Sequence, residues 1–280
     1  MRLFVDNLTN VDFSYLCPQR GLVGETWLAH IELLGDLDKQ GMVCDFGIVK
    51  KVLRNWLDEQ LDHRLLVPKG HPQIHCIEND SETEIQLTLD SGERIITSAP
   101  AQAVTLINTD TISADNVAQW CIRQLHGVFA QSVQQIRLRF THEDINGPYY
   151  HYSHGLKKHQ GNCQRIAHGH RSKLLVWRNN ELCQQSMQSW SERWRDIYIA
   201  TKEDCIALNE EMASFAYQSE QGAFSLTLPS KRCYFVETDT TVEHIAQHLA
   251  NEIGKQFPND LIEVKAFEGI SKGAITSSAT

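Results

Sequence analysis

The residues most able to do chemistry lie close together in the second half of the chain. They are three histidines and one thiol: His154, Cys163, His168 and His170. Imidazole nitrogens suit zinc, and three protein ligands leave a fourth tetrahedral position for water or substrate. His168 and His170 would share one face of an extended strand, because residues i and i+2 point the same way there. The group predicts a catalytic zinc site on a sheet. The competing interpretation is a pair of surface histidines in a turn at Gly169.

Three features could transfer protons or bind a ligand. Cys163 could be a fourth zinc ligand, a buried apolar side chain, or a general base whose thiolate is stabilised by the metal and Arg165. In Asp62-His63 the carboxylate could fix the tautomer of the imidazole, although such pairs at helix ends are usually capping or solvated residues. Glu268 ends the last predicted strand and could accept paired N–H donors from a ligand, although most glutamates at strand ends face water.

The composition is typical of a globular chain with a small-molecule partner. Its 280 residues, 41% hydrophobic and 22% charged, are enough for two domains with buried cores. A formal charge of -9 disfavours nucleic acid or an anionic membrane as a partner. The eight cysteines include no CxxC pair, which indicates a reduced compartment, and the acidic N-terminal segment lacks a secretory apolar core. We therefore expect a cytoplasmic protein with no membrane segment.

The elements that must position these residues indicate a duplication. Residues 104–119 and 234–247 share Thr-Asp-Thr followed by an acidic residue and Val/Ile-Ala-Gln, with a one-residue offset. Each copy leads into an amphipathic helical pattern and then into a strand of alternating apolar residues, at 136–140 and 262–266. These shared patterns predict two copies of one module.

The beginnings of the two modules match more coarsely. Asp-Phe-Ser-Tyr at 12–15 corresponds to His-Tyr-Ser-His at 151–154, and a loop and an apolar strand follow each. In the first module Asp45 can cap a helix with a clear apolar stripe. An Asn-Gly-Pro turn at 146–148 separates two periodic regions and is the best linker candidate. We therefore predict modules at 1–146 and 147–280.

Together these residues resemble the family of 6-pyruvoyl-tetrahydropterin and 6-carboxytetrahydropterin synthases, twice over nearly the whole chain. The family pattern contains a zinc histidine, Cys before His-Gly-His, Gly-Met-Val-x-Asp-Phe, Asp-His, Thr-x-Glu-Asn and a pterin-anchoring Glu. The resemblance implies an α+β fold with two tandem tunnelling-fold (T-fold) modules. Each would be an antiparallel four-stranded sheet with two helices, and the modules would form a barrel on oligomerisation. It also implies a homo-oligomer, with a trimer favoured and a dimer or tetramer as alternatives.

The family pattern is divided between the two modules. The second module retains the metal, thiol and substrate positions: His154, His168 and His170 for zinc, Cys163 for the thiol, and Thr241, Glu243 and Glu268 for the substrate. The first module retains Asp62-His63. However, Val23-Gly24-Glu25 stands where His-Gly-His would be, and Leu16 or Cys17 replaces the upstream histidine. The resemblance therefore implies one composite site per chain and no zinc in the first module.

By the same resemblance, the protein is a Zn²⁺-dependent lyase acting on dihydroneopterin triphosphate or a related pterin. It would break a carbon-oxygen bond with loss of phosphate, or a carbon-carbon bond. Cys163 would remove a side-chain proton, His63 oriented by Asp62 would relay protons, and Glu268 would hold the pterin ring. The product would be 6-pyruvoyl- or 6-carboxytetrahydropterin, and the composition favours the second, which feeds queuosine-type deazapurines. Two alternatives are a non-catalytic zinc-binding T-fold scaffold and an enzyme similar to dihydroneopterin aldolase or epimerase.

Overall fold

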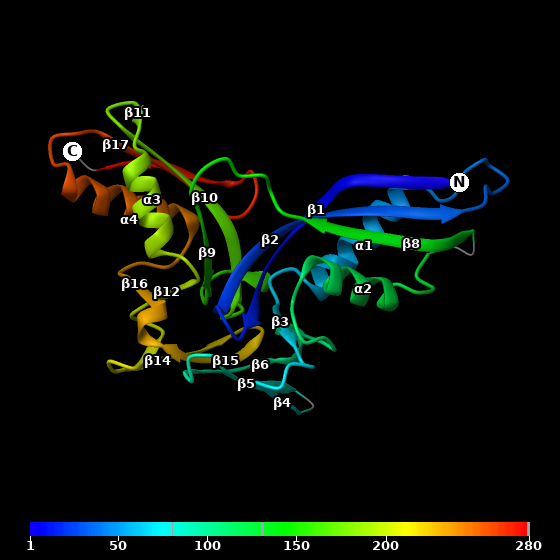
Figure 1. The fold of residues 1–280 in the computed structure, drawn as a ribbon, viewed down its shortest axis with the longest axis horizontal. Coiled ribbons are helices and arrows are strands. Elements are labelled where there is room, and N and C mark those ends of the chain that lie inside the picture. The colour runs from blue at the N-terminus through cyan, green and yellow to red at the C-terminus, as the bar shows by residue number, and fades with distance from the viewer. Residues whose placement is uncertain (80, 130–131, 279–280) are drawn as a thin grey trace.

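The computed structural model describes residues 1–79, 81–129 and 132–278, and Figure 1 shows two lobes with the chain termini at opposite ends. The first module contains β1 (Arg2–Cys17), β2 (Gly21–Gly35), α1 (Phe46–Gln60), β3 (Leu65–Pro68), β4 (Ile74–Glu78), β5 (Glu82–Thr88), β6 (Arg94–Pro100), β7 (Val104–Ile107), α2 (Ala114–Gln124) and β8 (Val133–Thr141). The second contains β9 (Tyr149–His154), β10 (His168–Arg178), β11 (Glu181–Leu182), α3 (Gln184–Arg193), β12 (Ile197–Thr201), β13 (Cys205–Leu208), β14 (Met212–Ser219), β15 (Gly222–Pro229), β16 (Cys233–Val236), α4 (Val242–Gln256), β17 (Ile262–Phe267) and β18 (Gly273–Ser277). Apart from the short β11 and the final β18, the order of elements repeats.

The helices begin where the sequence provides caps. Asp45 Oδ1 accepts a hydrogen bond from the Ile48 amide at 3.1 Å, which confirms the predicted start of α1. Ser113 and Thr241 cap α2 and α4 in the same way. We did not predict α3, because it is largely polar and buries little more than Met187 and Trp190 among its large side chains. None of the helices described is long and apolar enough to cross a membrane.

The main sheets differ from the antiparallel four-stranded sheets that we expected. The first has the order β7-β3-β1-β2-β8, and the second β16-β12-β9-β10-β17-β18 with β11 beside β10. The pairs β1/β3 and β3/β7 are parallel, as are β9/β12 and β12/β16. Parallel strands need a long connection between them, which β2 with α1 provides between β1 and β3, and β10 with α3 provides between β9 and β12. The sheets are therefore mixed.

A third sheet, which the sequence did not suggest, connects the two modules. Hairpins inserted between β3 and β7 and between β12 and β16 form one sheet in the order β13-β14-β15-β6-β5-β4. The two halves meet where β15 pairs with β6. The core beneath this sheet draws buried side chains from both modules, including Leu22 and Phe215. The modules therefore share one hydrophobic core beneath this sheet. They also cross, because the β1–β2 hairpin of the first module packs against strands of the second.

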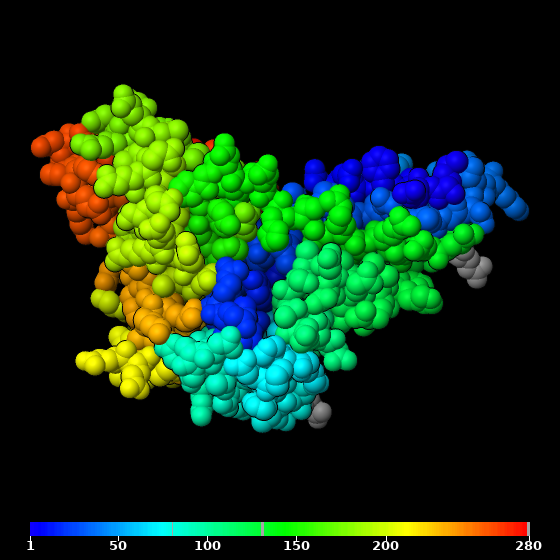
Figure 2. Space-filling view, viewed as in Figure 1, coloured from blue at the N-terminus to red at the C-terminus, as the bar shows by residue number. Residues whose placement is uncertain are grey.

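At that crossing point the end of the β1–β2 hairpin packs against β9 and β10, and Figure 2 shows it reaching the surface between the two lobes. Ser14 pairs with Gly24 in the first module as Ser153 pairs with Gly169 in the second, and the two serine Oγ atoms are 2.7 Å apart. This register confirms the match of residues 12–15 with 151–154. It also places Tyr15 at the position equivalent to His154, so our assignment of Leu16 or Cys17 to that position was wrong.

Candidate active site

Three buried histidines form the centre of the candidate site. His154 ends β9 and His168 begins β10, and the antiparallel register places the two directly opposite each other. His170 follows two residues later and projects from the same face of β10. The potential ligand atoms of the three side chains all lie within 4.8 Å of one another. The strand register therefore gathers the predicted metal ligands at one point.

The hydrogen bonds of these histidines leave nitrogens that fit a metal. His154 Nδ1 faces the Thr240 carbonyl at 3.0 Å and its hydroxyl at 3.1 Å, and His168 Nδ1 donates to the Arg165 carbonyl at 2.8 Å. His154 Nε2 and His170 Nε2 are buried without a hydrogen-bond partner, and His170 Nδ1 lies at ion-pair distance, 3.2 Å, from Asp12 Oδ1. Burial, and then the neighbouring histidines, lower the pKa of His154 and His168. Neutral imidazoles with fixed tautomers are the form that binds zinc, so this donor set fits Zn²⁺.

Cys163 and His63 come together from different modules of one chain. Cys163 lies in the short helical turn between β9 and β10, and its Sγ is within 4.8 Å of the ligand atoms of His63 and His168. His63 Nδ1 contacts Asp62 Oδ2 at 2.5 Å. Burial opposes the charge on His63, but Asp62 and then Cys163 outweigh it and raise the pKa of His63 to about 10. A protonated imidazole beside a thiol favours the thiolate.

The Asp62-His63 turn is held from both modules. His63 has a positive φ of 53°, and its amide donates to the Asp12 carbonyl at 2.6 Å. Arg165, from the loop that carries Cys163, donates from Nη1 to the carbonyls of Asp62 at 3.3 Å and His63 at 3.4 Å. Its Nε donates to Gln221 Oε1 at 3.1 Å, at the tip of the β14–β15 hairpin. Strand, loop and inserted hairpin therefore all position this turn.

The predicted substrate residues lie at different distances from the histidines. Glu268 follows β17, with Oε1 3.9 Å from His170 Nε2 and Oε2 3.9 Å from Lys272 Nζ. Thr241 caps α4, directly after the Thr240 that orients His154. Glu243 lies exposed in the first turn of α4, and no described contact connects it with the histidines. The structure thus brings Glu268 to the site and puts Thr241 one residue away from it.

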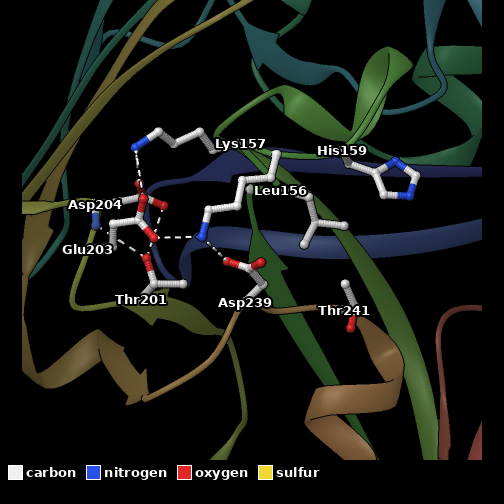
Figure 3. A pocket seen from close by; sticks show the side chains of 10 residues that line it. Leu156, Lys157, His159, Thr201, Glu203, Asp204, Asp239 and Thr241 are labelled. Carbon is white, nitrogen blue, oxygen red and sulfur yellow. Dashed lines mark hydrogen bonds and ion pairs between the residues drawn. The ribbon is translucent and has the colours of Figure 1, made fainter.

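Thr241 also lines a cavity of about 170 Å³, which Figure 3 shows. Lys157 Nζ lies 3.3 Å from Glu203 and 3.5 Å from Asp204, and Lys158 Nζ lies 2.7 Å from Glu203 and 3.2 Å from Asp239. These three carboxylates offset the charge of the two lysines. The cavity therefore offers no net positive charge to an anion.

The equivalent position in the first module holds no metal ligand set. The register puts Tyr15, Val23 and Glu25 at the places of the three histidines. Arg20 occupies this region, where it binds Asp196 through two hydrogen bonds of 2.5 and 2.9 Å and donates to the Tyr15 hydroxyl at 3.1 Å. Among the described residues, both groups that could bind a metal contain His168. A tyrosine, a valine and a glutamate therefore stand where the second module has its three histidines.

Asp12 and Thr240 are site residues that sequence reasoning missed. The match of 12–15 with 151–154 contained a signal for Asp12, because it showed an acidic residue where the second module has His151. Thr240 gave no signal beyond its position next to Thr241. Both touch a histidine of the site from a distant part of the chain.

Known proteins are similar to parts of this chain. The chain is 22% identical over 129 residues to a Pyrococcus horikoshii protein provisionally named 6-carboxy-5,6,7,8-tetrahydropterin synthase, covering 46% of this chain and 73% of that one. It is 38% identical over 58 residues to the Rickettsia felis 6-carboxy-5,6,7,8-tetrahydropterin synthase, covering 21% and 36%. A catalytic-residue mutant of Plasmodium vivax 6-pyruvoyltetrahydropterin synthase has a TM-score of 0.39 at 18% identity, over 50% of this chain and 97% of that one. The sequence model described as 6-pyruvoyl tetrahydropterin synthase matches residues 17–151 and again 147–278. The chain therefore belongs to the 6-pyruvoyl tetrahydropterin synthase family, as a tandem duplication.

Proposed function

We propose that this protein is a zinc-dependent lyase acting on dihydroneopterin triphosphate or a closely related pterin, at one composite site per chain. The observation that carries the proposal is the contact of His63, from the first module, with Cys163 and His168 of the second. Neither module contains both a thiol beside a His-Gly-His motif and an Asp-His pair. Membership of a pterin-processing family supports the substrate class.

In this proposal His154, His168 and His170 hold Zn²⁺, which when bound would act as a Lewis acid toward oxygens of the substrate side chain. Cys163, as thiolate, takes a proton from a side-chain carbon. His63, protonated beside the thiolate, donates a proton and takes it back while Asp62 holds its ring in place. Glu268 accepts hydrogen bonds from the N–H edge of the pterin, because an ionised carboxylate is an acceptor only.

We propose 6-carboxytetrahydropterin as the product, which requires cleavage of the side chain. The names of the Pyrococcus and Rickettsia relatives support this choice over 6-pyruvoyl-tetrahydropterin. The two products differ in mass, so a single incubation separates them.

The test is incubation of zinc-loaded protein with dihydroneopterin triphosphate, followed by identification of the products by mass. We expect turnover by the wild type, a loss of at least about 100-fold in Cys163→Ala because the proton-abstracting group is gone, and no change in Cys17→Ala, a matched control outside the site. Metal analysis should give one zinc per chain, and none in a His168→Ala/His170→Ala variant. Equal turnover by Cys163→Ala, or by zinc-free protein, would refute the mechanism, and zinc binding without any product would leave only a scaffold.

A further inference from the structure

A buried carboxylate from the first module lies against a zinc-site histidine of the second. Asp12 Oδ1 is 3.2 Å from His170 Nδ1, a distance that suits an ion pair or a hydrogen bond, and Asp12 is only 3% exposed. The backbone after Glu268 makes room for this carboxylate. Gly269 has a φ of +69°, and a Cβ at that position would lie 2.5 Å from Asp12 Oδ1.

The carboxylate has two further partners. The Thr26 hydroxyl donates to Oδ1 at 2.6 Å, and Lys272 Nζ lies 3.0 Å from Oδ2. A buried charge is costly unless it is paired, and the Thr26 hydroxyl and the Lys272 ammonium provide that pairing.

The main chain of the same residue holds the proton-transfer pair. The Asp12 amide donates to Asp62 Oδ1 at 2.8 Å, and the Asp12 carbonyl accepts from the His63 amide at 2.6 Å. One residue of β1 therefore touches a candidate metal ligand through its side chain and both members of the Asp-His pair through its backbone.

We propose that Asp12 is the positioning residue of the composite site, fixing His170 for the metal and linking it to Asp62-His63. This inference rests on the proposed zinc site. A carboxylate that accepts the proton of Nδ1 leaves the Nε2 lone pair for the metal and makes the imidazole a stronger ligand. Loss of such a partner typically costs 10- to 100-fold in metal affinity.

The second module lacks this carboxylate at the equivalent position. The register places His151 there, with Nδ1 2.7 Å from the Gly24 carbonyl, and burial lowers its pKa. The two modules thus complement each other: the first carries Asp12 and the Asp-His pair, and the second carries the histidines and the thiol. Because burying a carboxylate is costly, Asp12 is explained by its contact with His170 rather than by the first module alone.

The test is a chelator-competition measurement of zinc affinity on full-length protein, which needs no pterin. We expect Asp12→Asn to bind zinc about 10- to 100-fold more weakly than wild type, and the visible spectrum of the Co²⁺-substituted protein to shift. His151→Asn, the matched substitution at the equivalent position, should leave both unchanged. Thr26→Val keeps the charge of Asp12 but removes the hydroxyl that donates to Asp12 and accepts from the Arg171 amide. It should therefore weaken zinc binding by about 2- to 10-fold, the usual cost of a lost hydrogen bond. Thr26→Val is the test of this inference if Asp12→Asn does not fold.

The outcomes separate this inference from the proposed function. Unchanged zinc affinity and Co²⁺ spectrum in a folded Asp12→Asn protein would overturn the inference even if the wild type turns over pterin; if only Thr26→Val folds, unchanged affinity there would do so. Weakened affinity in a protein that never turns over pterin would support the inference and refute the enzyme. A wild type that binds no zinc would overturn both.

Discussion

At the residue scale, Asp62 uses both carboxylate oxygens to position His63. Oδ2 contacts His63 Nδ1 at 2.5 Å, and Oδ1 accepts from the Asp12 amide at 2.8 Å. In Asp62→Asn the side-chain NH2 would face either the Asp12 amide or His63 Nδ1, and two N–H donors cannot hydrogen-bond each other. The His63 ring would therefore lose its orientation. We expect kcat to fall by about 10²- to 10⁴-fold, the usual contribution of general acid-base catalysis, with zinc content unchanged. Asp58→Asn, an exposed carboxylate near the same helix end, is the control and should keep wild-type turnover. Equal loss in both variants would contradict this role for Asp62.

Arg165 connects the zinc side of the site with the Asp-His turn. Its carbonyl accepts from His168 Nδ1, and its guanidinium donates to the carbonyls of Asp62 and His63. Burial, and then repulsion from Arg64, lowers the pKa of Arg165 to about 10, so the group stays charged at neutral pH. We expect Arg165→Met to lower kcat by about 10-fold or more, because a change that shifts the catalytic groups out of position costs at least that much. KM should change little. Arg165→Lys, which keeps the charge and one donor, should recover part of the rate.

Alkylation by iodoacetamide gives a readout of the Arg165 variants without substrate. If Arg165→Met lets the His63 turn move away, Cys163 loses a positive neighbour and its alkylation at neutral pH should slow. Cys17 in the same sample is the internal reference, because it lies outside the site. Cys163 alkylation as fast as in wild type, together with unchanged kcat, would show that Arg165 does not position the turn.

At the element scale, the composite site depends on how closely two hairpins cross. A Cβ on Gly24 would lie 1.8 Å from the Tyr152 carbonyl oxygen and 2.6 Å from the His170 amide. A Cβ on Gly169 would lie 2.7 Å from the Gly24 Cα, which explains why glycine separates the two histidines. We expect Gly24→Ala to lower the free energy of unfolding by about 3 kcal/mol or more, because backbone atoms cannot yield as side chains can.

Denaturant unfolding measures this effect, and zinc affinity should fall with it because the crossing sets the position of His170. The control is Gly254→Ala in α4, where a Cβ would meet only the Ser278 side chain. Alanine is the better helix former by about 1 kcal/mol, so the control should be neutral or stabilising. A Gly24→Ala protein as stable as wild type would mean that the hairpins do not cross this tightly.

The elements that could be predicted from the sequence are those with local signals. Capping by Asp45 and the stripe from Val49 to Leu57 predicted α1, and alternation predicted β8 and β17. By contrast, α3 lacks a capping side-chain bond and an apolar stripe of ordinary width. The third sheet was not predictable because the pairing of β15 with β6 joins residues of different modules. Pairings between residues of different modules cannot be read from the periodic pattern of apolar residues within either strand.

The same reasoning explains which parts of the site were predicted. His154, Cys163 and Asp62-His63 stood out through motif and duplication, and the structure brings them together. Asp12 and Arg165 act by contacts that only the crossing of the modules creates. Glu243 matched a motif but lies exposed at a helix start, where an acidic residue is favourable for the helix dipole alone.

At the scale of the whole molecule, the first main sheet ends in the edge strand β8, whose free edge could pair with a strand of another copy of the chain. Among the described strands β8 pairs with β2 alone, and between β8 and α2 lies a cavity of about 740 Å³. Apolar side chains (Ile122, Phe129, Val133, Ile136 and Leu138) line part of this cavity, and polar side chains such as Gln119, His126 and Arg137 line the rest. An unpaired edge beside apolar surface is a site for strand pairing between copies. The family resemblance favours a trimer, and we propose a homotrimer whose sheets close into barrels through this edge.

Native mass spectrometry should therefore give three times the 31.9 kDa mass of the chain. Ile136 lies half-buried on β8 and would be covered by the neighbouring copy, so Ile136→Glu should reduce the mass to that of one chain, because a charge cannot be buried there unpaired. Ile48→Glu, at an exposed position of α1, is the control and should remain trimeric. Because Cys163 and His63 already meet within one chain, monomeric Ile136→Glu should still bind one zinc. A monomeric wild type, or an Ile136→Glu protein that remains trimeric, would show that this edge does not form the interface.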